Sequence, residues 1–329
     1  MGISVADSAR IIGEIWAGQA VRVAQGTIIR SGGSGGVRLG HGSMVLENSV
    51  VIGSEAQQAV IGRKTVFGHK CVCIDAQIGD LCEVGNGTIF MPGAKVGDRC
   101  IFGEGTIVPP GAEIPADSVV VGRPGRVIRK LTAADLEMIS RMRGGDTSLR
   151  PESYTTAIED PKEMVGMGKL YGHRGKFPTV DATARICETA ELTGDVVVGA
   201  GSVIASGVKI IGDSHGPVRI GANVHILENT VLHLLPDNEL IIADGVTIAP
   251  NCIIHGTTIG AGTIVEPGSI VCDYSRVGRN VLIKAGSLVK QRDVVADNVV
   301  VEGFPAKQTG ENAIALERPV WAFRQLTQE

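Results

Sequence analysis

An aliphatic residue that returns every six positions is the feature that most constrains how this chain can fold. In the C-terminal half these positions are Ile259, Val265, Val271, Val277, Ile283 and Val289. A period of six fits neither an α-helix, whose period is 3.6, nor a long β-strand, whose period is two. Short-period repeats of this kind are typical of a solenoid of short parallel strands, in which each coil packs on the next.

The same period occurs in the N-terminal half, and the two halves align with each other. Residues 30–126 match residues 211–307 at a constant offset of 181 without a gap. Upstream of Arg30 the offset changes to 175, a difference of six, which is one strand and turn of the repeat. An insertion of that length keeps the inward-facing pattern intact. The alignment predicts an internal duplication.

The duplication divides the chain into four predicted segments. They are a β-helix domain over residues 1–130, a helix and linker over 131–179, a second β-helix domain over 180–310 and a tail over 311–329. In the second segment Thr132 can cap a helix with Asp135 at the third position, and an apolar stripe at helical spacing follows. Three hexads would form one triangular coil of about 18 residues, and stacked coils would bury the aliphatic columns and pair the backbone groups.

Composition and charge narrow the class of function. Hydrophobic residues make up 43% of the chain but aromatic residues only 3%, so the core must consist of Val, Ile, Leu and Ala. The formal net charge of −4, without a basic stripe, argues against nucleic acid as a partner. We expect no membrane span, because no apolar run approaches about 18 residues, and no signal peptide. Seven cysteines without a CxxC pair indicate a reducing compartment, and we expect a cytoplasmic protein.

Three segments carry a resemblance to a known family. They are GRPGRVIRKLTAADLE at 122–137, VLH at 231–233 and VTIAPNCIIHGTTIG at 246–260. Together with the hexads, the first resembles the hexapeptide-repeat proteins, and the other two look like the γ-class carbonic anhydrases within that superfamily. The resemblance implies an all-β solenoid made of two left-handed parallel β-helix domains with a connecting α-helix and linker.

The resemblance also implies a metal site. In that family a trimer of β-helices holds zinc at each subunit interface, with two histidines from one subunit and one from its neighbour. Here His233 and His255 match two ligands in the C-terminal half, and His69 matches the third in the N-terminal half. The remaining ligand positions hold Pro250, Ile52 and Ile74. Each half therefore retains what the other lacks, which predicts Zn²⁺, or another divalent transition metal, on a site shared between the halves.

Four further residues match catalytic positions of the family. Its Arg-x-Asp pair is divided in the same way, with Arg30 in the N-terminal half and Asp213 in the C-terminal half. Glu47 and Glu228 take the position of the acidic neighbour and could move protons. A zinc-bound hydroxide would then attack CO₂ or another small carbonyl substrate.

Two departures leave the true substrate open. Leu46 and Leu227 replace the family glutamine that contacts the zinc-bound water, which makes the site more apolar. Cys71 and Cys252 lie near the expected ligands in equivalent positions, and we expect them to pack in the core rather than bind metal. We expect His225 to be a surface or interface residue.

Several interpretations remain open from the sequence. The three histidines could be remnants of decaying repeats, the two glutamates could be turn carboxylates, and Arg30 with Asp213 could be a structural interface pair. Besides a zinc enzyme acting on a small molecule, the chain could be a non-catalytic assembly subunit or a hexapeptide acyltransferase that uses a single histidine as base. In each case we expect a homo-oligomer.

Overall fold

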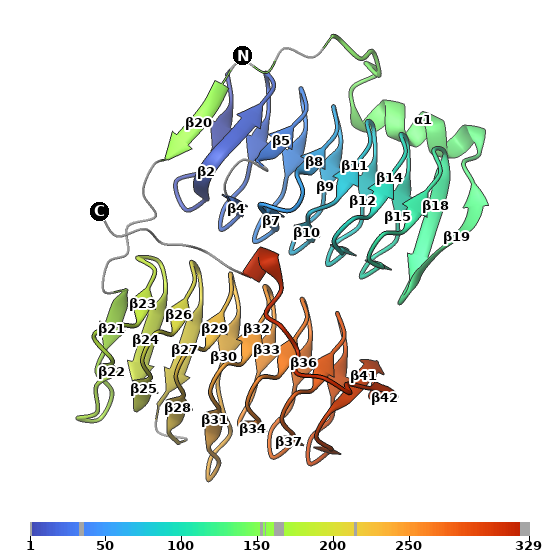
Figure 1. The fold of residues 1–329 in the computed structure, drawn as a ribbon. Coiled ribbons are helices and arrows are strands. Elements are labelled where there is room, and N and C mark those ends of the chain that lie inside the picture. The colour runs from blue at the N-terminus through green and yellow to red at the C-terminus, as the bar shows by residue number, and fades with distance from the viewer. Residues whose placement is uncertain are drawn as a thin grey trace. The chain divides into compact units, whose positions relative to one another are not determined.

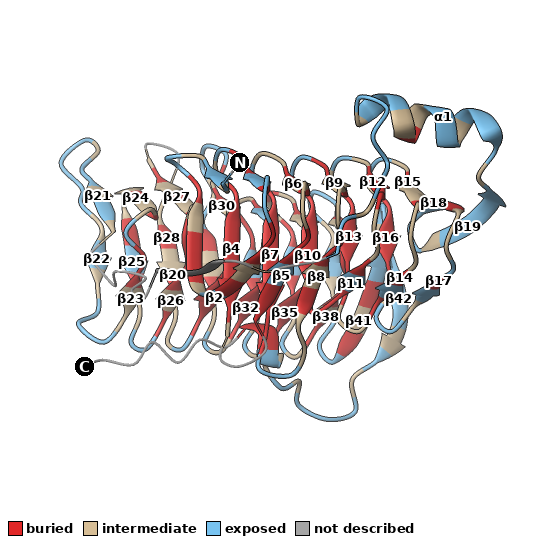
Figure 2. Ribbon diagram, turned by 90° about the horizontal axis from the view of Figure 1, so that it is seen from above, coloured by how far each residue is buried: buried red, intermediate tan, exposed pale blue. Residues whose placement is uncertain are grey.

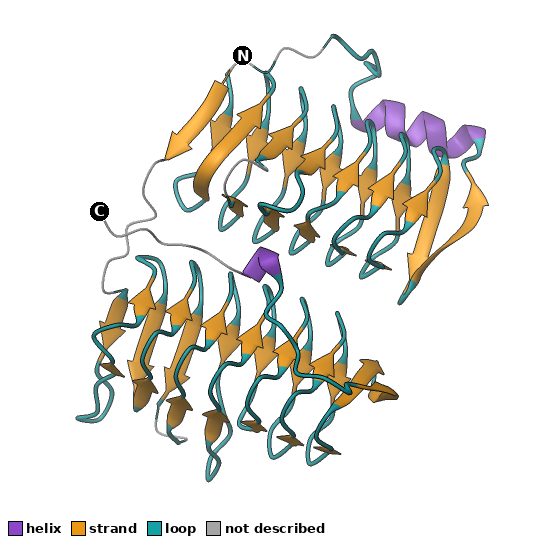
Figure 3. Cartoon of the chain, viewed as in Figure 1, coloured by secondary structure: helices purple, strands orange, loops and turns teal. Residues whose placement is uncertain are grey.

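The computed structural model describes residues 2–32, 36–151, 154, 156–160, 168–213 and 216–322. The chain divides into two compact units, unit 1 (Met1–Lys162) and unit 2 (Glu163–Glu329). Each unit is an all-β solenoid of short parallel strands with very little helix, which confirms the predicted fold class (Figures 1 and 3). The four finer segment boundaries and the internal duplication remain predictions.

Unit 1 has three walls of stacked strands. The first wall contains β1 (Ser4–Val5), β3 (Arg22–Val23), β6 (Met44–Val45), β9 (Val66–Phe67), β12 (Glu83–Val84), β15 (Ile101–Phe102), β18 (Ser118–Gly122) and β19 (Gly125–Lys130). The second wall contains β2 (Arg10–Ala17), β4 (Ile28–Ser31), β7 (Val50–Gly53), β10 (Val72–Ile74), β13 (Ile89–Phe90) and β16 (Ile107–Val108). The third contains β5 (Val37–Leu39), β8 (Ala59–Ile61), β11 (Gln77–Ile78), β14 (Lys95–Val96) and β17 (Glu113–Ile114). The long strand β2 joins the second and third walls, and β20 (Thr156–Asp160) pairs with it.

Unit 2 repeats this plan. Its first wall contains β23 (Arg185–Ile186), β26 (Val203–Ile204), β29 (His225–Ile226), β32 (Thr247–Ile248), β35 (Ile264–Val265), β38 (Leu282–Ile283), β41 (Val299–Gly303) and β42 (Ala306–Glu311). Its second wall contains β21 (Lys169–Tyr171), β24 (Glu191–Gly194), β27 (Lys209–Gly212), β30 (Val231–Leu232), β33 (Ile253–Ile254), β36 (Ile270–Val271) and β39 (Leu288–Val289). Its third contains β22 (Thr179–Val180), β25 (Val196–Val198), β28 (Val218–Ile220), β31 (Leu240–Ile242), β34 (Thr258–Ile259), β37 (Arg276–Val277) and β40 (Val294–Val295).

The pairing pattern is the same along every wall. Neighbouring strands are parallel and in register, as in the pairs Val231–Ile253 and Leu232–Ile254 of β30 and β33. The exceptions are the antiparallel hairpins β18–β19 and β41–β42, which end the two solenoids, and the antiparallel pair β2–β20. Because the register is constant, side chains at one position of successive coils form a column.

The inward columns form the hydrophobic core. Buried residues lie along the strands, whereas the turns and most of the helix are more exposed (Figure 2). In unit 1 the aromatic rings of Phe67, Phe90 and Phe102 lie in one core, with centroid distances of 6.0 Å and 4.9 Å between successive rings. The six-residue period therefore marks the residues that fill the interior.

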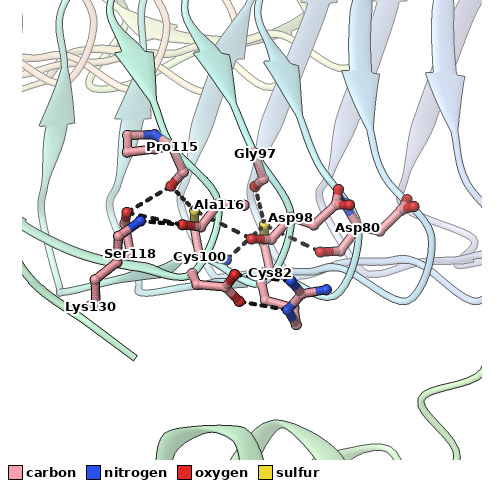
Figure 4. A network of polar contacts seen from close by, with 11 residues as sticks. Asp80, Cys82, Gly97, Asp98, Cys100, Pro115, Ala116, Ser118 and Lys130 are labelled. Carbon is pink, nitrogen blue, oxygen red and sulfur yellow. Dashed lines mark hydrogen bonds and ion pairs between the residues drawn. The ribbon is translucent and has the colours of Figure 1, made fainter. Parts of the chain in front are cut away.

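Polar side chains at the coil corners satisfy backbone groups of the neighbouring coils. In Figure 4 the thiol of Cys82 accepts from the backbone N–H of Cys100 at 3.3 Å and donates to the carbonyl of Gly97 at 3.4 Å. The Cys100 thiol repeats the second contact with Pro115 O at 3.3 Å. These buried cysteines therefore take the place that threonine or serine takes in other coils, such as Thr65, whose hydroxyl accepts from Cys82 N at 3.0 Å.

A C-terminal segment folds over the first wall in each unit. In unit 1 this is helix α1 (Ala133–Met142), and its capping box between Thr132 and Asp135 is confirmed. Ile139 is buried, and Arg143 donates to the carbonyls of Lys64 and Cys82 and pairs with Glu83. Burial raises the pKa of Glu83 against the opposing charge of Arg143.

The corresponding segment of unit 2 is the tail, whose described part includes a 3₁₀ turn (η2, Val320–Ala322). Arg318 donates to Thr247 Oγ1 at 3.0 Å and to the carbonyl of Gly245, and Trp321 is buried. Lys64 and Gly245 are 181 residues apart, so the two arginines bind equivalent carbonyls.

We expect Phe90→Ala to destabilise unit 1 by about 3–5 kcal/mol, because it removes the middle ring of the aromatic core and leaves a cavity. Urea unfolding followed by circular dichroism measures this change. Ile128→Ala, on an exposed part of β19, serves as the control and should change the free energy of unfolding by less than about 1 kcal/mol. Equal effects of the two substitutions would contradict the proposed role of Phe90.

Candidate metal centre

Two of the three predicted metal ligands lie next to each other in unit 2. His233 follows β30 and His255 follows β33, and these strands are neighbours in the second wall. The His233 N–H donates to Ile254 O at 3.0 Å, which continues the ladder to the histidines. Their rings are 6.0 Å apart between centroids and nearly perpendicular, at 88°. The constant register of the solenoid thus brings together residues that are 22 positions apart in the sequence.

This spacing is close to the one that the implied metal requires. Two imidazoles bound to one tetrahedral zinc ion through Zn–N bonds of about 2.0–2.1 Å have ring centres roughly 5 Å apart. The rings of His233 and His255 are 6.0 Å apart, so they would have to approach each other by about 1 Å to bind one ion. Both side chains are partly exposed, so an ion and a substrate can reach them.

The ring of His255 is held by a buried carboxylate. Its Nδ1 lies 2.8 Å from Oδ2 of Asp273, which is 18 residues further along the chain and therefore one coil away. The other oxygen of Asp273 accepts from the backbone N–H groups of Leu235 at 3.0 Å and Gly256 at 3.1 Å. Burial acts to raise the pKa of Asp273, but these hydrogen bonds and His255 together hold it below its ordinary value. Asp273 is therefore a stable anion beside the ring.

Asp213 lies on the other side of the pair. It follows β27, the strand before β30 in the same wall, and its Oδ2 is 3.7 Å from Nε2 of His233. This distance is longer than a hydrogen bond and within the range of an ion pair when the imidazole is protonated. The structure thus places Asp213 beside His233, and its role in a site remains a prediction.

The third predicted ligand, His69, lies in a turn of unit 1 after β9. Its side chain is 51% exposed, and its Nδ1 is 2.8 Å from Oε2 of Glu47, one coil earlier. Its backbone N–H donates to Oδ1 of Asn86 at 2.9 Å, which fixes the turn. His69 therefore has a carboxylate near Nδ1, but the contact lacks the hydrogen-bond geometry of the pair His255–Asp273.

A shared turn conformation positions Glu47 and Glu228. Each precedes an asparagine, Asn48 or Asn229, whose φ of 57° lies in the left-handed region that asparagine tolerates better than most residues. Glu47 is partly exposed, whereas Glu228 is buried. The two glutamates thus occupy equivalent corners in different surroundings.

The equivalent wall of unit 1 has lost the polar character of the site. Arg30 is 2% exposed, and the next two positions of its column, Ile52 and Ile74, are fully buried. Asp75 lies close enough for the charge of Arg30 to act on it. Burial raises the pKa of Asp75, while hydrogen bonds from Ser54 and the charge of Arg30 oppose the rise. Within unit 1, Arg30 thus has an acidic neighbour other than the predicted Asp213.

Other candidate ligands have different roles. Cys71 and Cys252 are buried, and burial raises the pKa of each thiol to about 12, so both remain protonated as core residues. His225 is also buried, and its Nδ1 lies 3.1 Å from the carbonyl of Ala322 in the tail. In the described part of each unit, no three His, Cys, Asp or Glu side chains form a group that could hold a metal ion.

Asp273 is the site residue that the sequence interpretation missed. The register of β33 and β36 stacks His255 on Cys272, and Asp273 follows directly. The available signal was therefore a carboxylate next to the residue that stacks on the histidine of the preceding coil.

Comparisons with known proteins identify the family. Residues 75–110 match the model of the bacterial transferase hexapeptide (six repeats). A carbonic anhydrase of Geobacillus kaustophilus is 36% identical over 142 residues, which are 43% of this chain and 78% of that protein. The mitochondrial gamma carbonic anhydrase 2 of Arabidopsis thaliana is 33% identical over 40% of this chain. The chain belongs to the γ-carbonic anhydrase-like hexapeptide-repeat family.

A further relative and a solved structure carry other names. The match to the Arabidopsis protein spans about half of that protein's length, 49%. The carnitine operon protein CaiE of Escherichia coli is 30% identical over 42% of this chain and 69% of that protein. A solved Bacillus cereus structure described as a putative acetyltransferase is 34% identical, with a TM-score of 0.44, over 44% of this chain and 84% of its own.

Among the described residues of this γ-carbonic anhydrase-like protein, no helix is long and apolar enough to cross a membrane.

We expect the thiols of Cys71 and Cys252 to resist alkylation by iodoacetamide in the native protein at pH 8. A pKa of about 12 leaves a thiolate fraction on the order of 10⁻⁴ at that pH. Peptide mass spectrometry should find Cys272, which is partly exposed, labelled before either of them, and all three labelled after unfolding in urea. Rapid labelling of native Cys252 would reopen it as a metal ligand.

Proposed function

We propose that this chain is a zinc-dependent enzyme of the γ-carbonic anhydrase type that hydrates or hydrolyses CO₂ or another small carbonyl substrate. The observation that carries the proposal is the pair His233 and His255, whose rings lie 6.0 Å apart while Asp273 holds Nδ1 of His255. A carboxylate on the far nitrogen of an imidazole is typical of histidines that bind zinc. The carbonic anhydrases among the relatives support the same chemistry.

We propose His69 as the third ligand, contributed by unit 1 of the same chain or of another chain in a homo-oligomer. Its exposure and the carboxylate of Glu47 at its Nδ1 support this role, because Nε2 then remains for another partner. The ligand position that it would replace in unit 2 is Pro250, which has no side-chain donor atom for a metal.

A bound zinc ion would supply a Lewis acid that makes water nucleophilic near neutral pH. The residues of the chain would orient and protect this chemistry. His233, His255 and His69 would hold the ion, and Glu47, which is partly exposed, would exchange protons with solvent. Glu228 is buried and would act only within the site.

The two remaining predicted catalytic residues have different support. Asp213 lies 3.7 Å from His233, which supports a role beside the proposed metal. Arg30 is buried and near Asp75, which supports the structural interpretation of this residue over a direct role in orienting substrate. Leu227, at the family glutamine position, is buried and apolar, so a substrate less polar than bicarbonate remains within the proposal.

Metal content tests the proposal. Inductively coupled plasma mass spectrometry should find about one zinc ion for each set of His233, His255 and His69 in the wild-type protein purified with zinc present. His233→Ala and His255→Ala should each reduce the zinc content at least tenfold, and His69→Ala should reduce it as well. The control His41→Ala, outside the motif, should retain the wild-type content, and the wild-type protein should accelerate CO₂ hydration in a stopped-flow assay.

Two outcomes would decide against parts of the proposal. Wild-type protein that takes up no zinc at micromolar concentrations would overturn the zinc enzyme. Full zinc content in His69→Ala, together with loss in His233→Ala, would keep the metal but assign its third ligand to another residue.

A second candidate function, acyl transfer, is supported by the match to the bacterial transferase hexapeptide model and by the pair His255–Asp273. A histidine whose Nδ1 is held by a carboxylate can act as a general base without metal. This candidate predicts a metal-free protein that binds acyl-CoA in calorimetry. The third interpretation, an assembly subunit, predicts neither metal nor acyl-CoA binding and a stable complex with unrelated chains.

A further inference from the structure

The carboxylate of Asp273 makes two different kinds of contact through its two oxygens. Oδ1 accepts from the backbone N–H groups of Leu235 at 3.0 Å and Gly256 at 3.1 Å, and from Asn238 Nδ2 at 3.3 Å. Oδ2 lies 2.8 Å from Nδ1 of His255. All three partners of Oδ1 are N–H groups, which can only donate. They fix the orientation of the Asp273 carboxylate independently of its contact with His255.

This orientation selects one tautomer of His255. Ionised Asp273 can only accept hydrogen bonds, so a neutral His255 must carry its proton on Nδ1 to form the 2.8 Å contact. Its Nε2 then bears a lone pair. A metal ion bound at Nε2 requires that lone pair, whereas the Nε2–H tautomer would carry a proton on this nitrogen.

Unit 1 shows what the same corner contains when no histidine is present. The positions equivalent to His255 and Asp273 hold Ile74 and Pro92, so the pair is absent as a whole. The N–H of Ser54, equivalent to that of Leu235, is instead bound by Asp75 at 2.6 Å. Anchoring of this loop therefore does not require a carboxylate in the position of Asp273, whereas the contact with His255 does.

We propose that Asp273 is a positioning residue that fixes His255 in the Nδ1–H tautomer and presents its Nε2 lone pair to a divalent metal ion. The purpose of this arrangement rests on the proposed function, but the tautomer itself is a property of the metal-free chain. The inference can therefore fail or hold separately from metal binding.

The first test needs no substitution. Metal-free protein labelled with ¹⁵N-histidine is examined by long-range ¹H–¹⁵N correlation under conditions in which His255 is neutral, with His255→Gln used to assign its signal. We expect the signals of the Nδ1–H tautomer. A predominance of the Nε2–H tautomer, or an even mixture, would overturn the inference.

The second test is Asp273→Asn, which preserves shape. The backbone donors of Leu235 and Gly256 require an oxygen, so the new amide would turn its NH₂ group toward Nδ1 of His255 and reverse the tautomer. We expect the Nε2–H tautomer in the metal-free variant and zinc affinity weaker by about 10–100-fold, measured by competition with a chelator.

Asp75→Asn is the matched control, because Asp75 binds the equivalent N–H in unit 1 and lies in a coil without the histidine pair. It should leave the His255 tautomer and the zinc affinity unchanged. A reversed tautomer in Asp273→Asn with unchanged zinc affinity would overturn the positioning role while leaving the zinc site in place. The wild-type protein and Asp273→Asn could show the predicted tautomers although the wild-type protein binds no zinc. That result would support the hydrogen bond between Asp273 and His255 and would overturn the proposal of a zinc enzyme.

Discussion

The structure depends on the hydrogen-bonded stacking of one short coil on the next in constant register. Strands of two or three residues have no stability of their own, and each is held by the backbone groups of the coils on either side. The register places residues with the same position in successive coils directly above one another. His233 and His255 lie side by side because of this rule, whereas Asp273 stacks on Gly256 and reaches the neighbouring His255 with its side chain. The chemistry at the corner is a consequence of the stacking.

Much of the fold could be predicted from the sequence, because a period of six has few physical solutions. Its inward positions, such as Val265 and Val271, fill the core, and the capping pattern at Thr132 and Asp135 begins the helix between the halves. The closeness of His233 and His255 follows from the same periodicity once a family motif has singled them out. The six-residue period fixes the residue types of the inward positions only. It therefore cannot predict contacts between side chains in the corners and loops.

Asp273 and Arg143 illustrate that limit. Asp273 lies one residue beyond the position that stacks on His255, and its hydrogen-bond partners depend on the loop that contains Leu235 and Asn238. Arg143 lies after a helix that is outside the repeat, so its contacts with Lys64 and Glu83 have no counterpart in the periodicity. The placement of His69 as a ligand depends on how chains or units assemble, which involves surfaces that the repeat leaves nearly uniform. For this reason the third ligand remains a proposal.

The wall of unit 1 differs from that of unit 2 at the positions that align with the histidine pair. Ile52 and Ile74 are fully buried there, and Arg30 in the same column is buried near Asp75. A branched aliphatic side chain offers no ligand atom and adds apolar surface to the core. The histidine pair is thus a feature of the unit 2 wall, whereas His69 lies in a turn of unit 1.

The hairpins β18–β19 and β41–β42 have a consequence for the growth of such a molecule. A stack of parallel coils exposes unpaired backbone groups at its last strand, and another copy could add there indefinitely. In each unit the chain reverses direction and covers that edge of the first wall with its own antiparallel strand. The reversal breaks the translational symmetry on which an open-ended filament would be built. The hairpins therefore favour a particle of finite length.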